Sequence, residues 1–363
     1  MIDVAEVTER LIAIPSVSGK EAAILDTIRA ELPASLTIVE GDAVLLALPE
    51  RRPGAPLILL AGHVDTVLVG RSAPGRREGN TIHGRGAADM KGGLAVMLAL
   101  ADELATGRFD SDFDTGFLFF GREELPFARS ALLPFLRQHR ERGRSLEPDG
   151  EALAIVLEPT DNRLELGCLG NLTIELTVEG AAAHTARPWL GRNAIHDAIE
   201  LLAPLAARPP REVSLDGLTF REVVSITGIE GGLATNVVPD RATATINLRY
   251  SPTTSPEDAE RELVALVTGP SATVRVLGNA PPGPVPAANP LVDRLRTAGD
   301  LALAPKQAWT PVAEFGLIGI DAVNFGPGDP EYAHRDDERV EIAALERARD
   351  VLRAFLRNTR TGG

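Results

Sequence analysis

The stretch LILLAGHVDTVLVG, residues 57–70, is an apolar run that carries His63 and Asp65 toward its end. Side chains two residues apart in a β-strand point to the same face, so we expect His63 and Asp65 to lie side by side. A strand this apolar is typical of the buried centre of an α/β sheet, where ligands bind beyond the carboxyl ends of the strands. A histidine next to a carboxylate suits a metal site, because the carboxylate holds the imidazole in the required tautomer. Alone, such a pair is more often a polar strand end that satisfies its own hydrogen bonds.

Acidic residues follow three more strand-like stretches. Asp89 lies in a glycine-rich turn after TIHGRG. Glu123 and Glu124 follow the apolar run TGFLFF, and Glu158 follows ALAIVL. Acids gathered at one edge of a sheet repel one another unless positive charge lies between them. Two divalent cations would balance three carboxylate ligands and a bridging hydroxide, and would leave a fourth acid free as a base. The sequence therefore predicts a dinuclear metal site.

A second histidine for this site comes from the end of the chain. The strand DAVNF, residues 321–325, leads into GPGDPEYAHRDDE, which contains His334. The other candidate histidines, His83, His139 and His196, lack such a context, and we interpret them as structural.

The glycine-rich turn around Asp89 could instead cradle a phosphate. It has neither the G-x-G-x-x-G spacing of a dinucleotide site nor the Gly-Lys-Ser/Thr of a P-loop. We therefore reject a nucleotide site at this turn.

The composition limits the class of protein. With 363 residues the chain is long enough for two domains, and 44% of the residues are apolar. The net charge of −14 argues against nucleic acid or an anionic membrane as a partner. Cys168 is the one cysteine, so no intrachain disulfide forms, and a small buried side chain is its simplest interpretation. The amphipathic, acidic N-terminus does not resemble a signal peptide, and no apolar run is long enough to span a membrane. We expect a cytoplasmic protein.

The periodicity of the apolar residues divides the chain into two domains. Up to residue 168 and again from 282 to 363, apolar strands alternate with helices such as 3–14 and 20–32, and the glycine-rich turn opens an amphipathic helix. This predicts an α/β catalytic domain with a mixed, largely parallel sheet flanked by helices. Residues 169–281 instead carry strands of alternating apolar and polar residues and two helical segments. They predict an inserted α+β domain with an antiparallel sheet and two helices.

One strand of the inserted domain, RATATINLRY at 241–250, places an arginine on its polar face. Ala244, Ile246, Leu248 and Tyr250 form the apolar face, so Arg249 projects from the other side. An arginine there is usually solvated, but it can also bind a carboxylate through two parallel hydrogen bonds.

An ordered set of motifs resembles the dinuclear-zinc aminoacylase, carboxypeptidase and deacylase family. The motifs are GHVDTV, GRGAADMKGG, the Glu-Glu pair, LEPT, GAAAHTARPWLGRNAIHDA, TNVVPD, INLRY and FGPGDPEYAH, in the order of the family and over nearly the whole chain. Each motif alone is weak evidence, whereas the ordered set is specific. The resemblance implies a catalytic domain made of both chain ends and an inserted domain through which a homodimer forms.

The resemblance also implies roles for single residues. His63 and Glu158 would bind one Zn²⁺, Glu124 and His334 the other, and Asp89 would bridge them, with Co²⁺ as an alternative in one position. Asp65 would orient His63, and Glu123 would be the general base. A cis peptide bond would follow Asp89. His184 would stabilise the oxyanion, in its own subunit or across the dimer, and the residues that bind the substrate carboxylates would be Asn236, Arg249 and Arg187.

Within the family the motifs are most similar to those of desuccinylases. This implies hydrolysis of N-succinyl-L,L-diaminopimelate to succinate and L,L-diaminopimelate, a step of lysine and diaminopimelate biosynthesis. The alternatives are a deacylase of N-acetylornithine or another N-acyl amino acid, a short-peptide carboxypeptidase and, more distantly, a non-catalytic metal-binding dimer module.

Two departures from the usual family wording concern the surroundings of the acid pair. Arg122 and Leu125 flank the two glutamates in GREELPFARSALLPFL, and the polar segment 137–150 is longer than in compact relatives. Neither departure removes a predicted ligand, but both leave the identity of the substrate open.

Overall fold

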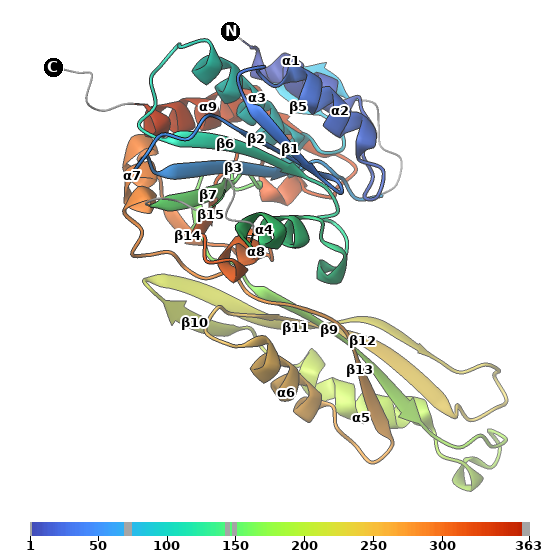
Figure 1. Ribbon diagram of the computed structural model, residues 1–363. Helices are drawn as coiled ribbons and strands as arrows, with labels where there is room; N and C mark the ends of the chain where they lie inside the picture. Colours follow the sequence, from blue (N-terminus) through green and yellow to red (C-terminus); the bar gives the residue numbers. More distant parts are fainter. Residues whose placement is uncertain (1, 69–74, 142–145, 147–150, 358–363) are drawn as a thin grey trace. The chain divides into compact units, whose positions relative to one another are not determined.

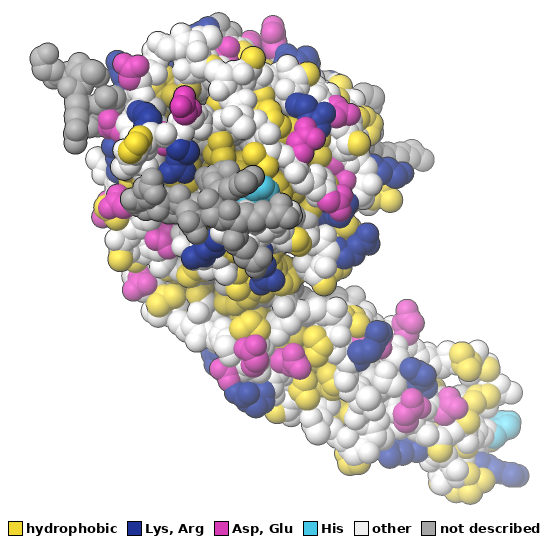
Figure 2. All heavy atoms as spheres, viewed as in Figure 1, with side chains coloured by type: hydrophobic (Ala, Val, Ile, Leu, Met, Phe, Trp, Pro, Cys, Tyr) yellow, Lys and Arg dark blue, Asp and Glu magenta, His cyan; other side chains and the backbone are white. Residues whose placement is uncertain are grey.

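The computed structural model describes residues 2–68, 75–141, 146 and 151–357, which form two compact units (Figure 1). The first unit combines Met1–Gly167, Pro286–Pro305 and Thr310–Gly363, and the second combines Cys168–Val285 and Lys306–Trp309. No helix among the described residues is long and apolar enough to cross a membrane. On the face drawn in Figure 2, the lysine and arginine side chains lie among the acidic ones and form no continuous basic patch.

An eight-stranded sheet forms the centre of the first unit, in the order β1-β2-β6-β3-β7-β15-β8-β14. The four central strands are parallel. They pair antiparallel with β2 on one side and β8 on the other, and β14 pairs parallel with β8, which confirms the predicted mixed, largely parallel sheet. The strands are β1 (Thr37–Gly41), β2 (Val44–Leu48), β3 (Leu57–His63), β6 (Asp114–Phe120), β7 (Ala152–Val156), β8 (Leu164–Leu166), β14 (Leu303–Pro305) and β15 (Ala322–Asn324).

The most apolar strands are buried from end to end. Every residue of β3 and of β6 is buried, as expected for strands covered on both faces. In the parallel pairing of these two strands His63 lies opposite Phe120, so both strands end at the same edge of the sheet. The segments that follow β3, β6 and β7 therefore begin close together.

Helices cover both faces of this sheet (Figure 1). The helix α3 contacts β3 and β6 and is itself covered by α1 and α9, whereas α8 contacts β7 and β15 from the other face. We expected α3 to be amphipathic, but nearly all of its residues are buried, because other helices cover the side that faces away from the sheet. The helices are α1 (Val4–Ile12), α2 (Ala22–Glu31), α3 (Gly92–Ala105), α4 (Leu132–Glu141), α7 (Pro290–Gly299), α8 (Val312–Leu317) and α9 (Ile342–Leu356), with short helical turns at η1 (Ala87–Lys91), η2 (Phe127–Arg129) and η4 (Pro330–Tyr332).

A small three-stranded sheet contacts η1, the turn that contains Asp89. It consists of β4 (Arg76–Glu78), β5 (Thr81–His83) and β16 (Arg339–Glu341), with β5 in the middle. The described part of the glycine- and arginine-rich stretch 70–80 forms β4, because the edge of β5 offers it backbone partners. Residues 69–74 lie outside the described part of the chain, as does most of the predicted connection in 137–150, where α4 extends to Glu141.

The second unit is a five-stranded antiparallel sheet with two helices on one face, as predicted. The strand order is β10-β11-β12-β9-β13, and α5 and α6 pack on the face that bears the alternating apolar residues of β9 and β12. Periodicity did not predict the edge strands β10 and β13, because many of their side chains are exposed. The elements are β9 (Gly170–Glu179), η3 (Pro188–Leu190), α5 (Ala194–Ala206), β10 (Arg211–Leu215), β11 (Leu218–Gly231), β12 (Arg241–Tyr250), α6 (Pro256–Leu266) and β13 (Ala272–Ala280).

The contacts draw the boundary of the second unit differently from the predicted boundaries 169–281 and 282–363. Lys306–Trp309 belongs to the second unit, although it lies far beyond residue 281 in the sequence. The side chain of Gln307 accepts a hydrogen bond from the Arg221 amide at 3.1 Å and donates one to the Thr219 carbonyl at 3.2 Å. The domain boundary was predicted from the spacing of apolar residues. That spacing carries no information about a polar side chain that hydrogen-bonds to β11.

A buried carboxylic acid, Glu314, joins α8 to the start of α4. Its side chain is 1% exposed and accepts a hydrogen bond from the Ser130 hydroxyl. Burial raises the pKa of Glu314 from its ordinary value near 4.5 to about 7, although hydrogen bonds from Ser130 and the Leu133 amide stabilise the carboxylate and lower the pKa. Folding therefore makes Glu314 hold its proton more tightly than it does in the unfolded chain.

We predict that Glu314→Gln removes a pH-dependent loss of stability. As the pH rises from about 4.5 to 7, the unfolded chain releases the Glu314 proton before the folded chain does, so the free energy of unfolding falls by about 3 kcal/mol. Glutamine resembles the protonated acid and cannot ionise. Denaturant unfolding between pH 5 and pH 8 should therefore show the variant gaining stability over the wild type as the pH rises, whereas Glu346→Gln, on the exposed side of α9, should not. An unchanged difference across this range would contradict the prediction.

Candidate metal centre

His63 lies at the carboxyl end of β3 and is fixed from both sides of its ring. Nδ1 lies 3.0 Å from the backbone oxygen of Asp65 and 3.6 Å from the Asp65 carboxylate. Nε2 lies 2.9 Å from Oδ1 of Asp89. Both His63 and Asp65 are buried, and the 3.6 Å between the His63 ring and the Asp65 carboxylate agrees with side chains two residues apart that point the same way. This orientation directs Nε2 toward the acidic cluster.

Asp89 is the central acid of this cluster. It lies in η1, directly before α3, and its peptide bond to Met90 is cis, as the family resemblance implied. Its Oδ1 faces Nε2 of His63 at 2.9 Å, and its Oδ2 faces Nε2 of His334 at 3.3 Å. The two oxygens of one carboxylate thus face two different histidines.

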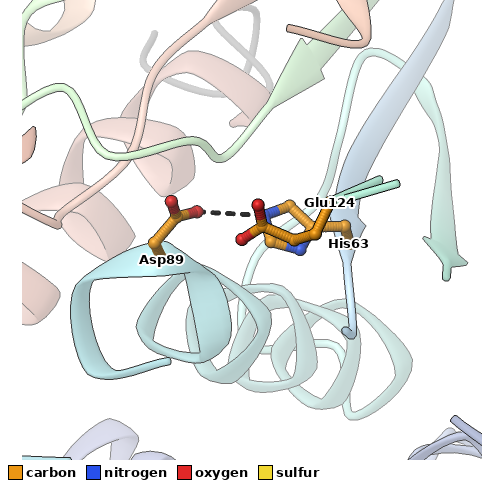
Figure 3. A group of neighbouring side chains, drawn as sticks. All are labelled: His63, Asp89 and Glu124. Atoms are coloured by element: carbon orange, nitrogen blue, oxygen red, sulfur yellow. Dashed lines mark hydrogen bonds and ion pairs between the residues drawn. The ribbon is translucent and has the colours of Figure 1, made fainter. Parts of the chain in front are cut away.

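Each histidine has a glutamate as a second neighbour. Oε1 of Glu158 lies 3.9 Å from Nε2 of His63, and Oε1 of Glu124 lies 3.0 Å from Nε2 of His334. Ligand atoms of His63, Asp89 and Glu124 all lie within 4.8 Å of one another, as Figure 3 illustrates. The structure therefore brings together all five predicted ligands, in two halves that share Asp89.

The electrostatics of the cluster call for positive charge. Burial opposes the charged form of His63, but Asp65, Asp89 and Glu158 outweigh it and raise the pKa of His63 well above its ordinary value. Hydrogen bonds to Asp89 and Glu124 raise the pKa of His334 to about 10. Burial also opposes ionisation of Asp89, yet the two histidines hold the pKa of its carboxyl well below the usual range. Imidazole nitrogens and carboxylate oxygens are ligands that Zn²⁺ and related cations accept, so the donor set fits two divalent cations.

Glu123 differs from the other acids of the cluster. Burial, together with the nearby Glu158, Glu124 and Asp89, outweighs the opposing effect of His63 and raises the pKa of Glu123 well above its ordinary value. Among the described residues, no hydrogen bond or ion pair holds its carboxylate. A carboxylate with a raised pKa and no fixed partner can accept and return a proton.

Asp65 does more than orient His63. Its two carboxylate oxygens accept the backbone N–H groups of Glu123 and Glu124, each at 3.2 Å. Oδ2 also accepts a hydrogen bond from the Ser18 hydroxyl at 2.7 Å. Burial opposes its charge, but these bonds and His63 lower the pKa of Asp65. The sequence analysis missed Ser18, because nothing in the segment IPSVSGK marks one of its serines as different from the other.

Two glycines allow the segment before His334 to approach the other ligands closely. A Cβ atom on Gly326 would lie 2.4 Å from the carbonyl oxygen of Glu158, and one on Gly328 would lie 2.2 Å from that of Ala88. Side chains at these positions would push the backbone away from the segments that carry Glu158 and Asp89. The close packing accounts for the two glycines of FGPGD.

Glu338, which the sequence analysis did not single out, holds the backbone of the Asp89 turn. It is 2% exposed, and its Oε1 accepts the N–H groups of Ala88 at 3.2 Å and Asp89 at 3.1 Å. Its Oε2 accepts a hydrogen bond from Arg85 at 2.7 Å. The sequence HRDDE offers three neighbouring acids with no sign of which one is buried.

Lys91 ties the same turn to the N-terminal helix. Its ammonium group is buried and donates to the carbonyl oxygens of Leu11 at 3.0 Å and Ile14 at 2.7 Å. Burial lowers the pKa of Lys91 to about 8, although Glu338 opposes this shift. The cation therefore lies at the C-terminal end of α1, where the helix dipole favours positive charge.

The remaining predicted site residues lie in the second unit. The amide of Thr185 donates to the carbonyl of Asn236 at 3.1 Å, which brings the segments of His184 and Asn236 side by side. The Ala186 amide donates to Nδ1 of His184 at 3.0 Å, so the ring proton lies on Nε2, which is then a donor. Arg187 is exposed, and Arg249 lies on the polar face of β12. How these residues approach the metal centre stays a prediction.

We predict that Glu338→Gln weakens metal binding. The neutral amide would place N–H groups against Arg85 or the Asp89 turn and so loosen a ligand that both halves of the site share. We expect the Zn²⁺ affinity, measured by competition with a chromophoric chelator, to fall about 10- to 100-fold. Asp337→Asn is a matched control, because Asp337 is an exposed neighbour that pairs with Arg335. Equal affinities for the two variants, both folded by circular dichroism, would show that Glu338 has no such effect.

The chain is similar to known proteins over nearly its whole length. The family model "Peptidase family M20/M25/M40" matches residues 59–358. The chain is 41% identical over 362 residues to a putative succinyl-diaminopimelate desuccinylase DapE of Mycobacterium tuberculosis, covering 98% of both. It is 34% identical over 358 residues to a succinyl-diaminopimelate desuccinylase of Corynebacterium glutamicum, covering 96% of this chain and 95% of the relative.

Solved structures share the fold. A tripeptidase from Staphylococcus aureus aligns with a TM-score of 0.78 at 18% identity, over 98% of this chain and 97% of its own. The YXEP protein of Bacillus subtilis, a dinuclear metal binding peptidase, aligns with a TM-score of 0.68 at 16% identity, over 97% and 96% of the two chains. The matching family model and the ligand set of the site together support metal binding and hydrolase activity. This chain belongs to peptidase family M20/M25/M40.

Proposed function

We propose that this protein is a two-zinc amide hydrolase that splits N-succinyl-L,L-diaminopimelate into succinate and L,L-diaminopimelate. The observation that carries the proposal is the arrangement around Asp89, whose two oxygens each face one histidine with a glutamate nearby. The choice of substrate rests on the two relatives, 41% and 34% identical, whose names are those of succinyl-diaminopimelate desuccinylases. The enzyme would act in lysine and diaminopimelate biosynthesis, in the cytoplasm, without nucleic acid or membrane as a partner.

The two halves of the cluster assign the ligands in this proposal. His63 and Glu158 would hold one cation, His334 and Glu124 would hold the other, and Asp89 would be a ligand of both. Zinc suits the mixed nitrogen and oxygen donors, with cobalt as an alternative in one position. When bound, the cations polarise the amide carbonyl and lower the pKa of the attacking water.

Glu123 is the general base in the proposed reaction. It takes a proton from the attacking water and passes the proton to the leaving amine nitrogen. The raised pKa of Glu123 suits both steps, because a weaker acid is a stronger base. Asp65 positions Glu123 by accepting its backbone N–H at 3.2 Å.

Residues of the second unit complete the site in this proposal. His184 carries its ring proton on Nε2 and so offers a hydrogen bond to the oxyanion, in its own subunit or in the partner. Asn236, Arg187 and Arg249 bind carboxylates of the substrate. The predicted catalytic domain, 1–168 with 282–363, then holds the cations, apart from Lys306–Trp309, which belongs with the second unit. The inserted domain 169–281 is a dimerisation and lid domain.

Other substrates would use the same metal centre. A deacylase of N-acetylornithine or another N-acyl amino acid, or a short-peptide carboxypeptidase, needs the same ligands and the same base. A non-catalytic metal-binding module would be expected to lack a ligand or the base, but all of them are present among the described residues.

We further propose a homodimer that forms through the second unit. Residues 223–231 of β11 extend beyond the partner strand β10 and leave a free strand edge in the described chain. Ile229 on β11 and Ile199 on the adjacent α5 are 54% and 52% exposed. A free strand edge beside exposed apolar side chains suits pairing with a second copy.

The function is tested by comparing kcat/KM of the zinc-loaded protein on several substrates. N-succinyl-L,L-diaminopimelate, N-acetyl-L-ornithine, other N-acyl amino acids and dipeptides form the panel. We expect a preference of about a hundredfold or more for the succinyl substrate, because a site built for a carboxylate strongly rejects analogues that leave its polar groups unpaired. A preference for an acetyl substrate or a dipeptide would leave the metal centre in place and refute the desuccinylase function.

Glu123→Gln is the control variant for this assay. It should bind both cations, measured by elemental analysis, yet lose nearly all turnover, because the amide cannot accept the proton. Near-normal kcat in this variant would show that Glu123 is not the base.

The dimer is tested by sedimentation velocity. We expect the wild type to have a molar mass of about twice the 38.5 kDa of one chain. Ile229→Glu should shift the equilibrium toward the monomer, because a charge at the interface is costly to bury. Leu277→Glu on β13, at the opposite edge of the sheet, is the matched control, since Leu277 is similarly exposed at 43%. A wild type that stays monomeric at micromolar concentration would refute the proposed dimer.

A further inference from the structure

Arg249 is a partly buried cation without a carboxylate partner among the described residues. Its guanidinium makes one hydrogen bond, from Nε to Oδ1 of Asn247 at 3.2 Å. Burial lowers the pKa of Arg249. By contrast, Arg275 at the edge of the same sheet pairs with Glu175 at 3.0 Å, and Arg211 pairs with Glu222 at 2.6 Å. A partly buried guanidinium that lacks a counterion is costly and is suited to receive an anion.

Asn247 lies two residues before Arg249 on β12 and shares its face of the sheet. This is the polar face, because the alternating apolar residues of β12 pack under α5 and α6 on the other side. In the register with β9, Asn247 lies opposite Thr173 and Arg249 lies opposite Asn171. Both side chains therefore stand on the central strand pair of a five-stranded sheet, which is a rigid support.

The neighbours of Asn247 fix the orientation of its amide group. Its Nδ2 donates to the backbone oxygen of Leu172 at 3.3 Å, to Oγ1 of Thr173 at 2.9 Å and to Oδ1 of Asn171 at 2.7 Å. A backbone carbonyl can only accept, so it requires the nitrogen of Asn247 on its side. Nε of Arg249 can only donate, so it requires the oxygen on the opposite side. The two requirements agree and leave a single orientation.

This arrangement determines which edge of the Arg249 guanidinium is available. An arginine has five N–H donors, and Asn247 occupies the one on Nε. The two terminal nitrogens keep their four donors for another group. A carboxylate that binds to both terminal nitrogens forms two parallel, charge-assisted hydrogen bonds.

We propose that Asn247 is a positioning residue, which holds the Arg249 guanidinium so that its two terminal nitrogens bind a carboxylate of the substrate end-on. The inference rests on the proposed function of Arg249 as a carboxylate-binding residue. Asn247 acts through Arg249, so its contribution lies in substrate binding and not in the chemical step.

The test compares the steady-state kinetics of full-length, metal-loaded variants. The substrate is the member of the panel that the wild type hydrolyses best, so the test does not depend on the desuccinylase function. We expect Asn247→Ala to raise KM about tenfold, because Arg249 loses its fixed orientation, with kcat within about twofold of the wild type. Asn247→Asp should raise KM further, because its carboxylate pairs with Arg249 and competes with the substrate.

A matched control and a double variant separate positioning from a general structural effect. Thr245→Val changes a residue on the same strand and face as Asn247 but four positions away from Arg249, and it should leave KM unchanged. In an Arg249→Met background, Asn247→Ala should have almost no further effect on kcat/KM, because the guanidinium that Asn247 orients is no longer there. If the wild type hydrolyses no member of the panel, calorimetric binding of succinate gives the same comparison through Kd.

Three results would overturn the proposal. Asn247→Ala could match Thr245→Val in KM, it could lower kcat at an unchanged KM, or it could keep its full effect in the Arg249→Met background. The first would show that Asn247 does not matter for binding, and the other two that it does not act through Arg249.

Discussion

The convergence of acids at one end of a buried parallel sheet is the constraint on which the first unit depends. Parallel strands end at a common edge, so the segments that follow β3, β6 and β7 bring His63, Glu124 and Glu158 together. Burial makes the repulsion among the carboxylates costly, and at Glu123 the nearby His63 relieves it only in part. The ligand set is therefore most stable with cations bound, and metal binding and folding of this edge support each other.

Both ends of the chain contribute to the position of Asp89. Lys91 joins the turn to the carbonyl groups of α1, and Glu338 holds its backbone from the C-terminal side. Gly326 and Gly328 let the segment before His334 approach the same turn without side chains between them. The geometry of the shared carboxylate thus depends on segments near both ends of the chain.

In the second unit, hydrogen bonds between neighbouring strands hold the polar side chains in place. Its sheet is buried on the face of α5 and α6, and the other face of β12 carries side chains that neighbouring strands hold by hydrogen bonds. A strand pair is stiff, so an arginine attached to it through Nε keeps a defined direction. The first unit thus gathers carboxylates at the end of a parallel sheet, whereas the second holds the Arg249 guanidinium by a hydrogen bond on the polar face of an antiparallel sheet.

The sequence by itself determined the two-domain architecture, because periods of 3.6 and 2 residues and continuous apolar runs record which faces are buried. It also placed three of the predicted ligands, His63, Glu124 and Glu158, at or shortly after the ends of apolar strands. Only the tertiary structure decided that the two oxygens of Asp89 face His63 and His334, and that Ser18, Lys91 and Glu338 hold the segments around the metal cluster. The hydrogen bond between Asn247 and Arg249 in the second unit is likewise a product of the fold. These residues act through hydrogen bonds to particular backbone or side-chain atoms, most of them far away in the chain. Such bonds leave no periodic pattern in the sequence, so they become visible only when the chain has folded.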